Sequence, residues 1–173
     1  TSLKSVSATV LNVSEDHLDR YDSYQAYIDS KLTIYNGAEC IVVNEDDKQT
    51  HPVSTYSAPK ISFGASQGEY HLAEHNGSTY FAAKDDMLLP VNSLTVMGKH
   101  NYLNTLAVMA LLSPFNISNE VYKKALGHFN GLAHRCQFVA QLGGVKYFND
   151  SKATNVGATI AAIDSLSTGI EDL

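Results

Sequence analysis

The chain has 173 residues, of which 44% are hydrophobic and 17% charged, a composition typical of a soluble globular protein and not of a disordered one. The formal net charge is −6 and the twelve Lys and Arg residues are scattered, which argues against nucleic acid as the main partner. The sequence contains neither an apolar run of about 18 residues nor an export signal, and Cys40 and Cys136 form no metal knuckle, so we expect no membrane insertion and a reducing cytoplasm.

A strand–helix–strand unit is predicted for the first part of the chain. Residues 7–13 and 38–44 each contain a short apolar run typical of a buried strand. Between them, residues 24–35 place apolar side chains at helical spacing. Two such strands joined by a helix make a βαβ unit, so we expect an α/β fold with a parallel sheet.

Charged residues follow the first strand, where open α/β sheets bind ligands. His17 together with Glu15 or Asp16 has the chemistry of a divalent metal site. A solvated loop capped locally by Ser14 and Asp16 explains the same residues equally well. Lys31, on the predicted helix, is by its surroundings a surface lysine whose stem covers apolar side chains.

Short strands and then two helices are expected next. Four short strands, separated by Gly, Asn and Asp, read as a meander with no chemistry assigned: residues 61–63, 68–73, 78–82 and 87–91. The first helix runs to about Leu112 and carries Asn101 and Asn104 on one face near its start. Two such amides can hold a base edge or phosphate oxygens, although one can equally be a cap and the other an exposed polar residue. After a second helix, residues 127–131 read as a linker.

The last segment predicts a hairpin, a polar loop and a helix. Strands over residues 137–142 and 145–148 are joined by paired glycines, and residues 149–155 follow the second strand. Asn155 or Thr154 can cap the next helix, whose free N–H groups favour an anion. Lys152 adds a positive charge and Asp150 can accept bonds from ribose hydroxyls. An ordinary capped loop with a surface lysine is the alternative.

The sequence resembles the Mur ligase family in four strings that occur in the family's order: residues 11–21, 98–104, 131–135 and 149–155. The first two strings are shared broadly in the family, and the last resembles the form found in members that add D-glutamate. The resemblance implies a P-loop-type ATPase domain with a parallel sheet and an antiparallel meander over residues 1–130. It implies the start of a Rossmann-like C-terminal ligase domain over residues 131–173.

The resemblance also implies roles for residues of the first domain. His17 matches the histidine that binds a second Mg²⁺ ion, and Lys31 matches a lysine that the family carbamylates, giving a carboxylate that serves the metal. Both are therefore catalytic and metal-binding candidates. Asn101 and Asn104 match asparagines that contact the adenine and the phosphates of ATP.

For the second domain, the resemblance makes Arg135 and Asp150 nucleotide-binding residues. It places Lys152, as a catalytic candidate, and Thr154 near the phosphates and the incoming D-glutamate. The family's usual acid two residues beyond the arginine is Gln137 in this chain, so any electrostatic role of that acid is in doubt.

The implied reaction uses ATP and Mg²⁺ to phosphorylate the carboxylate of UDP-N-acetylmuramoyl-L-alanine, which the amine of D-glutamate then attacks, in a cytoplasmic monomer that serves peptidoglycan synthesis. No Gly-x-x-Gly-Lys-Thr/Ser phosphate loop occurs in the 173 residues, so we expect a fragment that is inactive in isolation. The alternatives are another amino-acid-adding ligase of the family, a folylpolyglutamate synthase-like enzyme, and a non-catalytic nucleotide-binding module.

Overall fold

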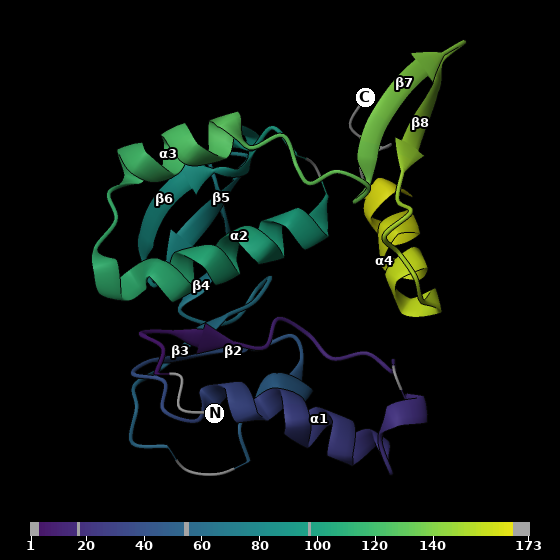
Figure 1. The fold of residues 1–173 in the computed structure, drawn as a ribbon. Coiled ribbons are helices and arrows are strands. Elements are labelled where there is room, and N and C mark those ends of the chain that lie inside the picture. Colours follow the sequence, from purple (N-terminus) through teal and green to yellow (C-terminus); the bar gives the residue numbers. More distant parts are fainter. Residues whose placement is uncertain (1–3, 17, 54–55, 97, 168–173) are drawn as a thin grey trace.

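A computed structural model describes residues 4–16, 18–53, 56–96 and 98–167 (Figure 1). The elements used below are β1 (Ala8–Thr9), α1 (Tyr24–Leu32), β2 (Ile41–Asn44), β3 (Lys60–Phe63), β4 (Tyr70–His75), β5 (Ser78–Ala83), β6 (Asp86–Pro90), α2 (Lys99–Leu112), α3 (Asn119–His128), β7 (Gln137–Leu142), β8 (Val145–Asn149) and α4 (Val156–Ser167). Short 3-10 helices cover Thr33–Tyr35 and Lys48–Thr50.

The main sheet has six strands in the order β1 to β6. Strands β1, β2 and β3 are parallel, β4 joins β3 in parallel through the pair Phe63 and Tyr70, and β4 to β6 form an antiparallel meander. The predicted α/β fold, with a parallel sheet and a meander, is confirmed. The assignment of residues 61–63 to the meander is wrong, because this strand pairs in parallel with β2.

Helices cover both faces of the parallel strands, with α1 on one face and α2 and α3 on the other (Figure 1). The side chains of β2 alternate between the two cores, as strand geometry requires. Val42 packs with α2 residues such as Leu106, whereas Ile41 and Val43 pack with Ile28 of α1. Strand β2 is therefore buried on both sides, which explains its uninterrupted apolar sequence.

Tyr35 is part of the core between α1 and the sheet, and its hydroxyl contacts three segments of backbone. Its side chain is fully buried, and its hydroxyl accepts a hydrogen bond from the Val10 N–H at 3.2 Å. The same hydroxyl donates to the Thr50 carbonyl at 2.8 Å and lies 3.2 Å from the Val42 carbonyl. The Val10 amide thus bonds to a side chain just beyond β1, and β1 is shorter than the predicted strand.

Both predicted hairpin turns are confirmed. Asn76 and Gly77 have φ values of 51° and 73°, and Gly143 and Gly144 have values of 56° and 82°. Positive φ at both central positions is the geometry that allows a two-residue turn between antiparallel strands.

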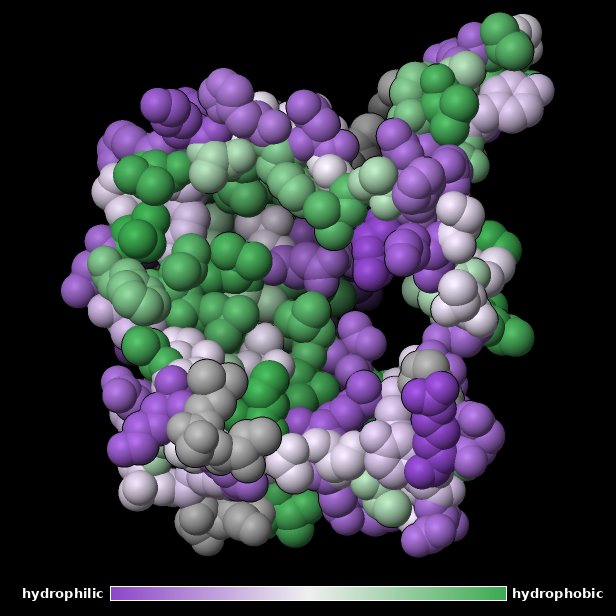
Figure 2. All heavy atoms as spheres, viewed as in Figure 1, coloured by the Kyte–Doolittle hydropathy of each residue, from purple (hydrophilic) through white to green (hydrophobic). Residues whose placement is uncertain are grey.

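The β7–β8 hairpin is a two-stranded sheet separate from the main one (Figure 1). The hairpin projects from the molecule, and hydrophobic residues are visible on its surface (Figure 2). Its exposed large apolar side chains are Phe138, Val139, Leu142, Val145, Tyr147 and Phe148. The division of the chain near residue 130 stays a prediction. Within the described residues, every helix is too short or too polar to cross a membrane.

Candidate active site

Polar residues follow the carboxyl ends of the parallel strands β1, β2 and β3. The Asp47 carboxylate accepts a hydrogen bond from the Val13 N–H at 2.7 Å, and the Asn44 amide donates to the Leu11 carbonyl at 2.8 Å. Asp46 accepts from the Ala65 N–H at 2.7 Å. These side chains tie together the loops that follow β1, β2 and β3, and so fix the floor of the site.

The loop between β8 and α4 is held by its own backbone and by the turn before β7. The Asp150 carboxylate accepts a hydrogen bond from the Cys136 N–H at 3.0 Å, and the Lys152 N–H donates to the His134 carbonyl at 3.2 Å. The Ala153 N–H donates to the Asp150 carbonyl at 2.9 Å. The side chain of Lys152 is exposed, so its ammonium is accessible to a ligand.

Asn155 joins this loop to the segment after β1. Its Oδ1 accepts a hydrogen bond from the Ala158 N–H at 2.8 Å, so of the two predicted caps, Asn155 and Thr154, it is Asn155 that caps the helix. Its Nδ2 donates to Asp16 Oδ2 at 2.9 Å, across 139 residues of sequence. The predicted anion loop and the predicted acidic segment therefore lie side by side.

The start of α2 lies beside α4. Asn101 is half-buried and Asn104 is exposed, on the first turns of the helix. Between Gly98 and Asn101, the ring of His100 turns toward α4, with Nδ1 2.7 Å from the Ser165 hydroxyl oxygen. Sequence reasoning missed this contact, because nothing in the spacing of two residues 65 apart signals it.

Burial lowers the pKa of His100, and the negative charge of Asp150 partly opposes the shift. In the unfolded chain, histidine titrates near pH 6.5. Below that pH the folded protein binds fewer protons at this site than the unfolded protein, so the contribution of His100 to stability is lost as the pH falls. We expect the full-length protein to lose more unfolding free energy between pH 7.5 and 5.5 than its His100→Asn variant. Urea denaturation at both pH values checks this, and equal losses would contradict it.

Arg135 is exposed in a tight turn that precedes β7. Both neighbours have positive φ values, 65° at His134 and 43° at Cys136. The Gln137 side chain accepts a hydrogen bond from the His134 N–H at 3.1 Å. Gln137 therefore holds the turn that presents Arg135, a task that needs an acceptor and no negative charge.

Lys31 lies in the last turn of α1. Its ammonium is 4.6 Å from the centre of the Tyr27 ring, a cation–π distance. It lines a cavity of about 310 Å³ between the start of β1, with Ser5 and Ser7, and the end of α1 with the 3-10 helix that follows it. His17 lies outside the described residues. Among the residues described, no three His, Cys, Asp or Glu side chains gather as a metal site, so the metal assignment stays a prediction.

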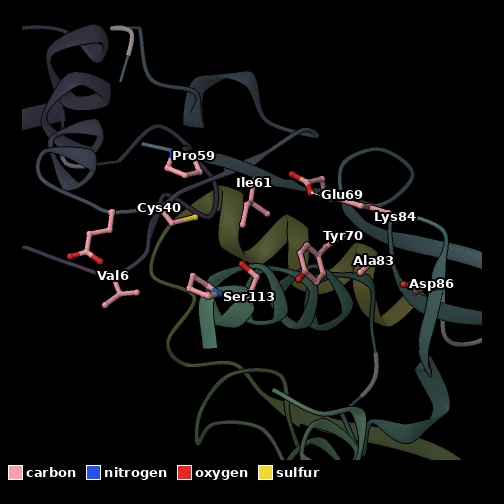
Figure 3. A pocket seen from close by; sticks show the side chains of 12 residues that line it. Val6, Cys40, Pro59, Ile61, Glu69, Tyr70, Ala83, Lys84, Asp86 and Ser113 are labelled. Carbon is pink, nitrogen blue, oxygen red and sulfur yellow. Dashed lines mark ion pairs between the residues drawn. The ribbon is translucent and has the colours of Figure 1, made fainter. Parts of the chain in front are cut away.

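A larger cavity, of about 610 Å³, lies at the other edge of the sheet (Figure 3). Cys40 and Ile61, at the amino ends of β2 and β3, line it with Tyr70, and a Glu69–Lys84 ion pair of 3.2 Å stands at its wall. Helix α2 begins at the carboxyl edge and ends at Leu112, one residue before Ser113, which lines this cavity. The length of the helix therefore separates the cavity from Asn101 and the loop before α4.

The sequence profile of the Mur ligase middle domain matches residues 2–112. The chain is 66% identical over 173 residues to the UDP-N-acetylmuramoylalanine--D-glutamate ligase of Pseudoalteromonas translucida, covering 100% of this chain and 38% of that protein. It is 45% identical over 166 residues to the ligase of the same name from Haemophilus influenzae, covering 95% of this chain and 38% of that protein. The chain thus spans well under half the length of these relatives.

Solved structures share the fold. MurF from Acinetobacter baumannii superposes with a TM-score of 0.73 at 22% identity, over 91% of this chain and 36% of that one. MurF ligase from Thermotoga maritima, solved in complex with ADP, has a TM-score of 0.72 at 19% identity, over 90% of this chain and 38% of that one. At such identities the likeness concerns the fold alone.

Proposed function

The chain belongs to the Mur ligase family, and from that premise we propose that the full-length protein is an ATP-dependent ligase that joins D-glutamate to UDP-N-acetylmuramoyl-L-alanine for peptidoglycan synthesis. The observation that carries the proposal is the 66% identity, over the whole chain, to a relative named for that reaction. The matched region includes the loop of residues 149–155, which resembles the form of this loop in family members that add D-glutamate.

In the proposed reaction, the γ-phosphoryl group of ATP passes to the carboxylate of the UDP-linked substrate and ADP leaves. The amine of D-glutamate then attacks the acyl phosphate, an amide C–N bond forms, the C–O bond to phosphate breaks, and the amine proton passes to solvent. Negative charge accumulates on oxygens in both steps, and fixed cations lower its energy. Lys152 supplies such a cation on a loop whose backbone is pinned at two points.

The nucleotide is proposed to lie between the two parts of the chain. Asn101 and Asn104 would hold it from the start of α2, and Arg135 and Asp150 from the opposite side, with Thr154 near D-glutamate. The bond between Asn155 and Asp16 supports this division of labour, because it brings the two sides into contact. The proposed domains, residues 1–130 and 131–173, meet at this contact.

Mg²⁺ would neutralise the phosphate oxygens, with His17 and carbamylated Lys31 as its proposed holders. Action as a monomer in the cytoplasm belongs to the same proposal. The further alternatives, another amino-acid-adding ligase or a silent nucleotide-binding module, predict different responses to amino acids.

We expect the purified full-length protein to release phosphate from ATP only with the UDP-linked substrate and D-glutamate together. A panel of L-alanine, D-alanine, L-lysine and D-glutamate, each at equal concentration, measures the choice of amino acid. Preference for another amino acid would favour a different ligase of the family, and ATP binding without turnover would favour the silent module. The 173-residue chain alone is expected to be inactive, since it lacks a phosphate loop.

A further inference from the structure

Helix α4 buries a polar residue and exposes its large apolar ones. Ser165 is 7% exposed, whereas Val156, Ile160 and Ile163 are 53–76% exposed. The face that α4 turns toward α2 carries Ser165, and it makes a polar contact there.

The contact of Ser165 is made to the start of α2. Its hydroxyl oxygen lies 2.7 Å from His100 Nδ1, a hydrogen-bond distance in a half-buried place. Gly98, with φ at 103°, makes room for it: a Cβ at this position would stand 2.2 Å from the Ser165 hydroxyl oxygen. Glycine at residue 98 is thus required both by the backbone conformation and by the approach of α4.

A second contact holds the other end of α4. Asn155 caps the helix and bonds to Asp16, and a Cβ on Gly157 would lie 3.7 Å from the Ser14 Cβ. The Asn155 and Ser165 contacts are about 15 Å apart along the helix axis, given a rise of about 1.5 Å per residue. Two anchors at that spacing fix the direction of α4 as well as its position.

We propose that the His100–Ser165 hydrogen bond is a latch that seats α4 on the start of α2 and so positions the preceding loop, with Lys152 and Thr154, against the nucleotide side of the site. Ser165 and His100 are positioning residues in this proposal. Their effect on catalysis rests on the proposed ligase function, whereas their effect on the seating of α4 does not.

The test uses the full-length protein with Ser165→Ala, His100→Ala and the double variant. A neutral hydrogen bond contributes about 0.5–1.5 kcal/mol, so each single change is expected to lower kcat/KM for D-glutamate about threefold to tenfold. The double variant should be no worse than the single ones, because both remove the same bond. KM for ATP should change less, since Asn101 and Asn104 remain in place. His100→Asn, which keeps a polar atom near the position of Nδ1, should restore most of the loss.

Hydrogen exchange of the same proteins tests the latch without activity. Amides of residues 98–104 and 156–166 should exchange faster in Ser165→Ala than in the wild type. Thr159→Ala is the matched control, because the Thr159 hydroxyl donates to the Asn155 carbonyl at the start of its own helix, and the change should leave exchange at residues 98–104 unaltered. Unchanged exchange at residues 98–104 in Ser165→Ala, or multiplying losses in the double variant, would overturn the latch. Faster exchange in a protein that never ligates would overturn the proposed function alone.

Discussion

Replacing Lys152 with methionine in the full-length protein is expected to lower kcat about 100-fold or more, with a small change in KM for ATP. The proposed reaction builds negative charge on the transferred phosphoryl group and on the tetrahedral intermediate, and loss of one fixed stabilising group costs about 10²–10³ in kcat in well-studied cases. Methionine keeps the length and apolar stem of the side chain and removes the charge. The backbone bonds of the loop, from the Lys152 N–H and the Ala153 N–H, do not involve the ammonium and should persist.

Lys146→Met is the matched control for that prediction. Lys146 is an exposed lysine of β8 on the same hairpin, opposite Gln141 and away from the loop before α4. Steady-state phosphate release with both variants separates a local charge effect from a loss of net charge. Equal activities of the two variants would remove Lys152 from the proposed machinery.

Replacing Tyr35 with phenylalanine is expected to lower the free energy of unfolding by about 1–3 kcal/mol. The change removes one oxygen and leaves the buried N–H of Val10 and the carbonyl of Thr50 without this partner. A buried polar group that loses its hydrogen bond carries the full cost of its desolvation. The phenylalanine ring still fills the core between α1 and β2, so the loss reports the hydrogen bonds and not a cavity.

Tyr56→Phe provides the comparison for Tyr35. Its hydroxyl donates to the Asn36 side chain at 3.0 Å in an exposed place, and its ring stacks edge-on against that of Tyr35. Water replaces an exposed hydrogen bond at little cost, so the loss for Tyr56→Phe should be a few tenths of a kcal/mol. Urea denaturation followed by circular dichroism measures both, and similar losses would refute the role of burial.

The features predicted correctly from the sequence are those encoded by neighbouring residues. A two-residue hairpin turn requires a positive φ, which the glycines at residues 143–144 supply, and the start of a helix requires a cap, which Asn155 supplies. Each feature is therefore predictable from a few neighbouring residues. The partner of strand β3 is not encoded in this way, since a four-residue strand such as Lys60–Phe63 fits a parallel and an antiparallel neighbour alike. Its place in the parallel sheet follows from tertiary packing.

In the candidate site, too, the features encoded by neighbouring residues were predictable and those that depend on tertiary packing were not. Asp150, Lys152 and Asn155 were identified from a local pattern of strand, polar loop and helix. The second bond of Asn155, to Asp16, and the contact of His100 with Ser165 depend on how separate segments pack, and no periodicity reports that. For Lys31, the proposed chemistry comes only from the resemblance to the family. Its surroundings in α1 are those of a lysine over a tyrosine ring and do not indicate a metal site.

The hydrogen bond between Asp16 and Asn155 can form only late in the synthesis of the chain. Its partners are 139 residues apart, and a ribosome adds about 5–20 residues per second, so Asp16 waits about 7–28 seconds for Asn155 to be synthesised. The six-stranded sheet ends at Pro90, and the helices α2 and α3 that cover one of its faces end at His128. The sheet and these two helices are therefore synthesised before the Asn155 side of the candidate site.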